Sequence, residues 1–529
     1  MFSTESSAEI VVHAYEEFGF NCLSKFNGMF AFCLWDSKNR LIFSARDRLG
    51  MKTLYYYSNQ ERFILASEIK GILADPSVPR KPNQRFIYEY LVRGYARARA
   101  HIQVGDTSFT EIKELMPAHY MIIEKDRISI WKYWRPTQNL KSNLQIVDDN
   151  SCASRLRQLL RDSINIRLPA NLPIGTFLSG GLDSTSIALL VDDILRSKHS
   201  TKIKHAKLQE IFSAIYNESI KQGDERYYIK EVEHALKTDV NYVFPSVVGE
   251  WNNIERFVYY IEEPVSVFNY YVFWYLFQVA KQKVRIVFIG QGSDAILGGQ
   301  PEHALIYFKE LWKTKKIGEL LKEMVKRLDW VIPRLVWSIL FRRKAEKNVK
   351  KLLAPKFATT CSKSKISKED TSLRNALLNE ITLHAVEYLR VDDRASSAFS
   401  MECRHPFLDH RIVEFAFSLP ATQKIRHGWT KYVMRNAMKG IIPEAIRKNR
   451  KKFGTPIPQQ RWMKELRQDI RKLFESETFC KREYFNQPAI LDIFDRYCEG
   501  KLNRIERQYY ADILWRILNL ELWLETFFD

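Results

Sequence analysis

Residues 177–186 read Phe-Leu-Ser-Gly-Gly-Leu-Asp-Ser-Thr-Ser, and the interpretation of the whole chain starts from them. An apolar, β-prone stretch leads into this run at 172–178, and apolar residues at helical spacing follow it at 185–191. The pattern therefore predicts a tight turn from a strand into a helix over 179–184. Two glycines would let the backbone approach a ligand closely, and free amides at a helix start bind anionic oxygens.

The acidic residue inside this turn, Asp183, indicates a metal ion rather than a direct contact with phosphate. Its carboxylate would repel phosphate unless Mg²⁺, which prefers oxygen ligands, lay between the two groups. A Walker loop is excluded, because the run has no GxxxxGK(S/T) pattern and no closing lysine. An ordinary glycine-rich turn without a ligand is the alternative.

The run SGGLDS resembles the pyrophosphate-binding loop of the ATP pyrophosphatases, which cleave ATP between its α- and β-phosphates. The resemblance implies that the phosphates of ATP lie against the turn itself. The expected cradle consists of Ser179, Gly180, Gly181 and Ser184, and Leu178, Leu182 and Asp183 are further expected ATP-binding residues.

Length and composition narrow the class of protein. A chain of 529 residues is too long for one hydrophobic core and predicts two or three domains. The net charge of +20 fits either a solvated lysine-rich surface, which we favour, or nucleic-acid binding. Seven scattered cysteines without a CxxC pair indicate a reducing compartment and argue against a zinc or disulfide framework. Without a signal peptide or an apolar run of ~18 residues, we expect a cytoplasmic protein with no membrane span.

The first 135 residues have the pattern of a mostly antiparallel β domain with a few helices. Apolar spacing predicts helices over 5–20 and 86–92, a buried strand over 28–36 that forms a hairpin with 41–47, and further strands at 53–57, 62–67 and 131–134. Residues 136–150 are polar and weakly patterned, so they are the predicted linker.

From residue 151 onward strands alternate with helices. A helix over 152–166 precedes the first strand, and β-like runs recur at 210–216, 240–243 and 284–289. This alternation predicts an α/β fold with a doubly wound parallel sheet, in which ligands bind beyond the carboxyl ends of the strands. Residues 302–370 are expected to be a basic helical insert, and residues 372–529 are expected to be all-helical.

With these features in view, the chain resembles the glutamine-hydrolysing asparagine synthetase family, which joins a glutaminase domain to an ATP-dependent synthetase domain. Matching segments include Asn27–Phe32, Ala45–Lys52, the SGGLDS loop, Gly290–Asp294, Met401–Arg411, Gly428–Arg435 and Lys451–Pro456. The resemblance implies an ATP-pyrophosphatase-type (adenine nucleotide α-hydrolase-like) synthetase domain with a helical C-terminal part over 151–529. It also implies a partial α+β glutaminase-like domain of the Ntn type over 1–135.

The N-terminal domain departs from the family pattern. The family uses an N-terminal cysteine as its nucleophile, whereas Met1 is followed here by Phe2, and Cys22 fits a half-buried core thiol. Ser7 stands where the family has an acid that binds the glutamine amine. We expect an incomplete glutaminase domain, because of a truncated start or a separate completing polypeptide, and impaired or absent glutamine hydrolysis.

The resemblance also implies the residues of the synthetase site. Gln291 replaces a family glutamate that is thought to assist proton transfer. Glu402 is then the expected base. The alternative for Glu402 is a structural salt bridge with Arg404. The catalytic cation is Arg450 or Lys451, and we favour Lys451 because a compact ammonium suits a phosphate contact. The other expected site residues are Asp183 and Asp294 for Mg²⁺, Gly290, Gly292 and Lys431 for the phosphates, and Leu178 and Phe212 beside adenine.

The implied reaction begins with attack of a carboxylate on the α-phosphorus of ATP, after which a nitrogen nucleophile displaces AMP. Three functions are consistent with the sequence. The first is an asparagine synthetase that uses aspartate with ammonia or glutamine, in the family's frequent homodimeric form. The second is an amide-forming enzyme acting on another small-molecule or peptide carboxylate, as lasso-peptide and β-lactam synthetases do. The third is a non-enzymatic basic binding protein, against which the intact SGGLDS loop argues.

Overall fold

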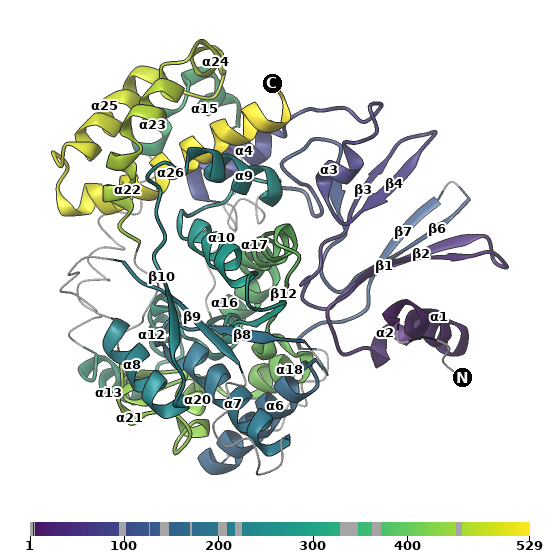
Figure 1. The fold of residues 1–529 in the computed structure, drawn as a ribbon, viewed down its shortest axis with the longest axis vertical. Helices are drawn as coiled ribbons and strands as arrows, with labels where there is room; N and C mark the ends of the chain where they lie inside the picture. The colour runs from purple at the N-terminus through teal and green to yellow at the C-terminus, as the bar shows by residue number, and fades with distance from the viewer. Residues whose placement is uncertain are drawn as a thin grey trace.

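The computed structural model describes residues 4, 6–94, 102–125, 127–137, 148–169, 172–198, 209–216, 225–327, 348–361, 372–450 and 457–529. Figure 1 shows a β-rich N-terminal part lying beside a larger part that contains the parallel sheet and most of the helices. Most of the predicted linker, two stretches of the predicted basic insert and Lys451 lie outside the described residues.

The N-terminal part is built on a four-stranded antiparallel sheet. Its strands are β1 (Ala31–Asp36), β2 (Leu41–Arg46), β6 (His119–Glu124) and β7 (Arg127–Lys132), in the order β1-β2-β6-β7. The predicted hairpin is confirmed, since β1 and β2 pair along their full length. The prediction that the first of these strands is buried is wrong, because its side chains are half-buried or exposed and Trp35 is 59% exposed.

Short helices and a smaller sheet complete this part. The helices are α1 (Ser7–Phe18), η1 (Gly19–Asn21), α2 (Cys22–Lys25), α3 (Ile69–Ile72) and α4 (Gln84–Arg93). The smaller sheet has the strand order β4-β3-β5, with β3 at Tyr55–Ser58, β4 at Phe63–Ala66 and β5 at Lys113–Glu114. The side chain of Asn83 caps α4 by accepting from the Phe86 amide. The hydroxyl of Tyr90 donates to the Val265 carbonyl, so α4 is buried against the second part of the molecule.

The second part is organised around a five-stranded parallel sheet. The order is β10-β9-β8-β11-β12, with β8 at Ile174–Phe177, β9 at Glu210–Ala214, β10 at Val240–Val243, β11 at Ile286–Phe288 and β12 at Glu402–Arg404. The predicted parallel sheet is therefore confirmed. Its fifth strand lies within the region predicted to be all-helical, and so does the hairpin of β13 (Ile425–Arg426) and β14 (Trp429–Thr430), so that prediction is wrong.

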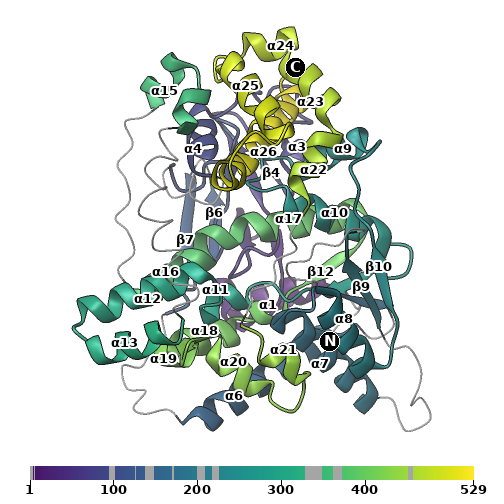
Figure 2. The same ribbon diagram turned by 90° about the vertical axis from the view of Figure 1, so that its left-hand side faces the viewer.

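Helices cover both faces of this sheet, as the doubly wound pattern requires. Alternate strand residues point to opposite faces, so Ile286 and Phe288 join one hydrophobic core and Val287 joins the other. Helices α6 (Asp149–Asn165), α7 (Leu182–Lys198) and α8 (Glu225–Leu236) pack in the first core, and α9 (Trp251–Ile261) and α10 (Asn269–Ala280) pack in the second. In Figure 2, α7 and α8 lie on one side of the sheet and α10 on the other.

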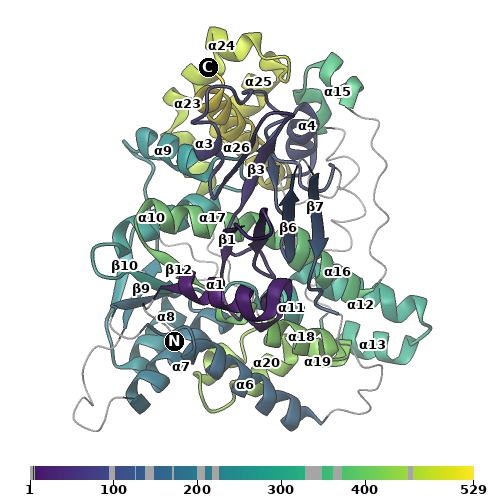
Figure 3. The same ribbon diagram turned by 90° about the vertical axis from the view of Figure 1, so that its right-hand side faces the viewer.

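The remaining helices follow the fourth strand. They are α11 (Ser293–Leu297), α12 (Pro301–Lys313), α13 (Ile317–Val325), α15 (Pro355–Cys361), α16 (Leu373–Asn379), the π-helix η3 (Glu380–His384), α17 (Ala385–Ala398), η4 (Pro406–Leu408), α18 (His410–Ser418), α19 (Ala421–Lys424), α20 (Tyr432–Ala437), α21 (Glu444–Arg447), α22 (Gln459–Glu465), α23 (Arg467–Phe474), α24 (Glu477–Lys481), α25 (Gln487–Cys498) and α26 (Arg504–Phe527). Figure 3 shows α12 and α13 extending outward from the lower part of the molecule. None of the described helices is long and apolar enough to cross a membrane.

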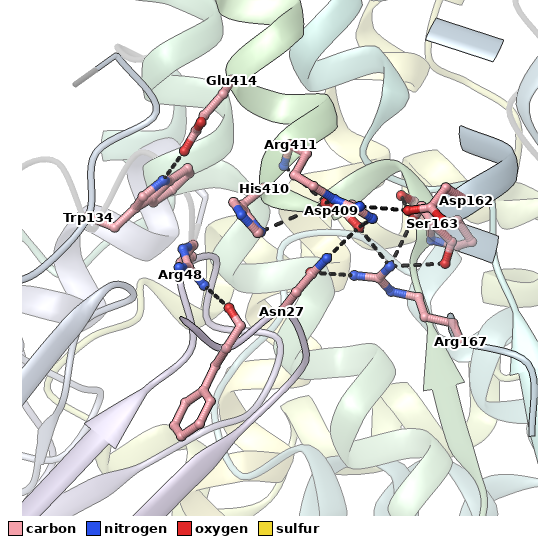
Figure 4. A network of polar contacts seen from close by, with 12 residues as sticks. Asn27, Arg48, Trp134, Asp162, Ser163, Arg167, Asp409, His410, Arg411 and Glu414 are labelled. Carbon is pink, nitrogen blue, oxygen red and sulfur yellow. Dashed lines mark hydrogen bonds and ion pairs between the residues drawn. The ribbon is translucent and has the colours of Figure 1, made fainter. Parts of the chain in front are cut away.

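Buried charged groups join the two parts of the molecule, as Figure 4 shows. Asn27 of the N-terminal part donates to Asp409 Oδ2 at 3.1 Å, and Arg167 donates to the same oxygen at 3.0 Å. Burial alone would raise the pKa of Asp409, but Arg411 and Arg167 hold it well below its usual range. A second junction pairs Lys52 with Asp393 at 2.7 Å. Both junctions bridge segments that are far apart in sequence, so each fixes the N-terminal part against the part that contains the parallel sheet.

Candidate active site

The turn at 179–184 forms as the sequence predicts, between the end of β8 and the start of α7. Gly180 has φ +71°, a conformation that glycine adopts without strain. The backbone amide of Ser179 donates to Ser184 Oγ at 3.1 Å, and the two hydroxyls also lie 3.1 Å apart. Both hydroxyls are thus held at the N-terminal end of α7, where the partial positive charge of the helix favours anions.

The loop after β11 packs directly against this turn. A β-carbon on Gly290 would lie 2.7 Å from the Ser184 backbone nitrogen, so only glycine allows this approach. Gly292 has φ +98°, and a β-carbon there would overlap Leu408. The glycines of the second loop therefore bring the carboxyl ends of two neighbouring strands together at one point.

A buried lysine joins these two loops. Lys431 Nζ lies 2.5 Å from Asp183 Oδ2 and 2.6 Å from Asp294 Oδ1, and it donates to Ser293 Oγ at 2.9 Å. A β-carbon on Gly299 would come within 1.8 Å of Asp294 Oδ1 and 2.1 Å of Lys431 Cε. The double glycine at 298–299 thus leaves the space that the ammonium and its carboxylate partner occupy.

The protonation of this cluster follows from its charges. Burial by itself lowers the pKa of Lys431, but Asp183 and Asp294 outweigh it and the pKa is raised. The ammonium therefore keeps its charge at neutral pH. The second carboxylate oxygen of Asp183 is buried without a hydrogen-bond partner, which leaves an acceptor open to a ligand.

The two carboxylates are suited to Mg²⁺. They come from separate loops after parallel strands, and oxygen donors of this kind are what Mg²⁺ prefers. The open Asp183 oxygen adds a donor that no protein group satisfies. Mg²⁺ binding by Asp183 and Asp294 stays a prediction, and in the structure Lys431 is the cation that neutralises both residues.

Arginines gather beside the turn around the indole of Trp429. The guanidinium carbons of Arg435 and Arg450 lie 4.9 and 4.4 Å from the centre of the Trp429 ring. Burial lowers the pKa of the Arg435 guanidinium to about 10. The charge of Asp183 would raise this pKa, whereas the charges of nearby arginines lower it further. Arg450 also donates to the Lys326 carbonyl at 3.2 Å. Because Lys451 lies outside the described residues, the choice between Arg450 and Lys451 stays a prediction.

Glu402 does not lie at the turn. It is the first residue of β12 and pairs in register with Ile286, at the opposite end of the strands from Gly290. Its carboxylate accepts from Arg404 Nε at 2.7 Å, and its side chain is 39% exposed. The alternative, a salt bridge between Glu402 and Arg404, is therefore present in the structure, and a role of Glu402 as the base stays a prediction.

An acid–base pair that the sequence did not reveal lies close to Asp294. The π-helix η3, which contacts α11, brings Glu380 Oε2 within 2.7 Å of His384 Nδ1. Burial and, to a smaller extent, the nearby charge of Asp294 would raise the pKa of the Glu380 carboxyl. The hydrogen bond and charge of His384, together with the charge of His303, have a larger effect, so the pKa is lowered. Turns of π-helix are rare and are frequent at functional sites. Nothing in the local spacing of this segment predicts the extra residue per turn.

The other predicted residues lie in or next to the two loops that follow β8 and β11, or on the neighbouring strand β9. The Leu178 amide donates to the Phe212 carbonyl at 2.8 Å, and both side chains are buried, so their place beside adenine stays a prediction. The side-chain oxygen of Gln291 is buried without a hydrogen-bond partner. An unsatisfied amide oxygen next to the turn is a position where a substrate donor could bind.

The first cysteine of the N-terminal part has the character of a core residue. Cys22 is fully buried on α2 among Leu23, Phe43 and neighbouring aromatic rings. Burial raises the pKa of its thiol to about 11, so it is protonated and shielded at neutral pH. Cys22 therefore lacks the exposure and the thiolate that a nucleophile needs.

Comparison with known proteins gives matches over nearly the whole chain. A family model described as asparagine synthase matches residues 155–525, and one described as a glutamine amidotransferase domain matches residues 1–134. Glutamine-hydrolyzing asparagine synthetase 3 of Bacillus subtilis (strain 168) is 27% identical over 468 residues, covering 87% of this chain and 71% of that protein. Asparagine synthetase 1 of the same strain is 25% identical over 556 residues, covering 98% and 82% respectively. A protein named amidase chyE from Penicillium rubens (strain ATCC 28089) is 25% identical over 495 residues, covering 84% of this chain and 72% of that protein.

Proposed function

Because the chain belongs to the asparagine synthase family, we propose that it uses ATP to form an amide bond on a carboxylic acid through an acyl-adenylate. The observation that carries the proposal is the cluster in which Lys431 bridges Asp183 and Asp294 at the SGGLDS turn. A bound ATP would place its β- and γ-phosphates against the turn and its α-phosphorus toward the substrate.

The proposed reaction has two steps. A carboxylate oxygen attacks the α-phosphorus, and the bond from that phosphorus to the bridging oxygen of pyrophosphate breaks. A nitrogen nucleophile then attacks the acyl carbon, AMP leaves, and the nitrogen loses a proton. The first step accumulates negative charge on pyrophosphate, which preorganised donors and cations stabilise.

The residues of the turn would perform the first step. The hydroxyls of Ser179 and Ser184 and the amides at the start of α7 would donate to pyrophosphate oxygens. Lys431, which contacts Asp183 in the first turn of α7, and Arg435 would balance the charge of the leaving group. Asp183 and Asp294 would hold Mg²⁺, which would supply further neutralisation of the charge on the leaving group.

We propose the Glu380–His384 pair as the acid–base group of the second step. Gln291 cannot accept a proton, whereas a histidine ordered by a carboxylate can. The side chain of His384 is 35% exposed and is held by Glu380 at 2.7 Å, so it can be reached by a substrate. A Glu380→Gln variant should lower amide formation more than adenylate formation, and equal losses in both steps would contradict this role.

Aspartate is the proposed carboxylate and asparagine the proposed product, as the names of the bacterial relatives suggest. The second candidate is amide formation on another acid, which the replacement of the family glutamate by Gln291 favours. We propose ammonia as the nitrogen donor of this polypeptide, since the buried Cys22 is unsuited to glutamine hydrolysis.

The test is ATP–pyrophosphate exchange with a panel of carboxylic acids, including aspartate, other amino acids and peptide carboxylates. Exchange with aspartate alone supports an asparagine synthetase, and exchange with a different acid supports the second candidate. No exchange with any acid would overturn the proposed chemistry. Product formation with ammonia but not with glutamine is the expected result for the nitrogen donor, and equal rates would overturn that assignment.

A further inference from the structure

Three metal-ligating side chains meet in the interior beside the fifth strand. Asp392 is on α17, Cys403 is in the middle of β12, and His405 follows the end of that strand. Their exposed fractions are 0%, 5% and 3%. None of them belongs to the proposed ATP site, and within the described ranges they are the only group of three such residues whose donor atoms converge.

The donor atoms of this cluster converge on one small volume. His405 Nε2 lies 2.9 Å from Asp392 Oδ2 and 3.5 Å from Cys403 Sγ. All three donor atoms lie within 4.8 Å of one another. A thiol, an imidazole nitrogen and a carboxylate oxygen thus surround a single point.

The second carboxylate oxygen of Asp392 supplies an independent observation. It is fully buried and has no hydrogen-bond partner. An unpaired carboxylate oxygen in the interior loses its hydration without replacement, so such atoms are rarely left without a partner or a ligand. A cation held by the cluster would satisfy this oxygen and the three converging donors together.

We propose that Asp392, Cys403 and His405 bind a divalent transition-metal ion of the zinc type. Sulfur, imidazole and carboxylate donors together select Zn²⁺ or a neighbouring transition metal over Mg²⁺ and Ca²⁺, which prefer oxygen alone. Cys403 coordinates as a thiolate after its proton passes to solvent. The two oxygens of Asp392 provide up to two of the four donors that a tetrahedral ion requires.

The position of the site indicates a structural role. Among the strands that the structure describes, β12 pairs only with β11, so it is an edge strand of the parallel sheet. A metal ion would tie it to α17, whose next residue, Asp393, forms the ion pair with Lys52 of the N-terminal part. The site would thereby stabilise the edge of the sheet and the junction between the two parts of the molecule.

The experiment measures metal content in the whole protein. Because the site is buried, the ion has to enter during folding, so the chain is expressed in medium supplemented with Zn²⁺ or with Co²⁺ and then desalted. Mass spectrometry of the eluted protein should find one metal ion per chain. The cobalt form should show a thiolate-to-cobalt charge-transfer band in the near ultraviolet.

Matched variants separate this site from adventitious binding. Cys403→Ser should abolish the charge-transfer band, and His405→Gln should lower the retained metal at least severalfold. Cys152→Ser, a change at another buried cysteine, and Cys480→Ser, at an exposed one, should leave the band unchanged. A band that survives Cys403→Ser but disappears in Cys480→Ser would overturn the proposal.

A second readout keeps the test decisive if Cys403→Ser fails to fold. Wild-type protein made in the Zn²⁺-supplemented medium and in the Co²⁺-supplemented medium should retain metal through desalting. The melting temperature of each preparation should exceed that of protein made in medium treated with a chelator. Wild-type protein without metal above background, from either medium, would overturn the proposal. None of these readouts depends on catalysis, so the result is independent of the proposed amide chemistry.

Discussion

Replacing Lys431 with methionine tests the most connected group in the proposed site. The substitution keeps the length of the side chain but removes the ammonium that lies 2.5 Å from Asp183 and 2.6 Å from Asp294. Two carboxylates would then face each other with no cation between them. The variant should lose both stability and the ability to balance charge on pyrophosphate.

The magnitude follows from burial. Breaking a fully buried ion pair costs about 3–5 kcal/mol. The Lys431 side chain is 8% exposed, but the two carboxylates are 22% and 27% exposed, so water compensates part of the loss. We expect the free energy of unfolding to fall by about 2–3 kcal/mol. Loss of one preorganised charge at the reacting phosphates should slow ATP–pyrophosphate exchange by about 100-fold or more.

Urea unfolding and exchange kinetics measure the two effects on the same preparation. Lys424→Met is the matched control, because it removes another buried lysine, one that donates to the Leu419 carbonyl and forms no ion pair with the site carboxylates. Undiminished exchange in Lys431→Met would refute the assignment. So would a loss of stability without a loss of exchange, since it would limit the lysine to a structural role.

Three further predictions concern other parts of the molecule. Gly299→Ala should reduce exchange by about 100-fold, because its β-carbon would displace the buried ion pair, whereas Gly318→Ala, where nothing lies within 4 Å, should leave exchange unchanged. Burial lowers the pKa of Lys424 to about 7, so the wild-type free energy of unfolding should fall by up to about 5 kcal/mol as pH drops from the ordinary lysine pKa toward 7. Lys424→Met should remove that dependence in a pH series of urea melts, and an unchanged slope would contradict the shift. Asp409→Asn should cost about 2–4 kcal/mol and expose the junction to limited proteolysis, and protection equal to wild type would contradict the proposed junction.

The hydrophobic pattern was sufficient to predict the parallel sheet and the turn at its centre. Short apolar, β-prone runs and the glycine-rich SGGLDS run are local signals, and the rule that ligands bind at the carboxyl ends of strands brought Asp183 and Asp294 together. Strand β12 escaped prediction because it is three residues long and carries Glu402 and Arg404. Such a strand forms through its pairing with β11 and not through its own composition.

The contacts that complete the site could not be predicted from spacing. Lys431 is 248 residues from Asp183 in sequence, and its role depends on the tertiary contact that places this N-cap residue of α20 beside Asp183 in the first turn of α7. The Glu380–His384 pair depends on a π-helical turn whose sequence resembles that of an ordinary helix. Both features arise from tertiary packing, which local sequence patterns do not encode.

Analysis of the products of ATP tests the central claim most directly. Wild-type protein incubated with ATP, Mg²⁺, ammonia and the accepted carboxylic acid should release AMP and pyrophosphate in equal amounts, and an Asp183→Ala variant should release neither at an appreciable rate. Formation of ADP and phosphate by the wild type, or AMP formation at the full rate by the variant, would contradict the account.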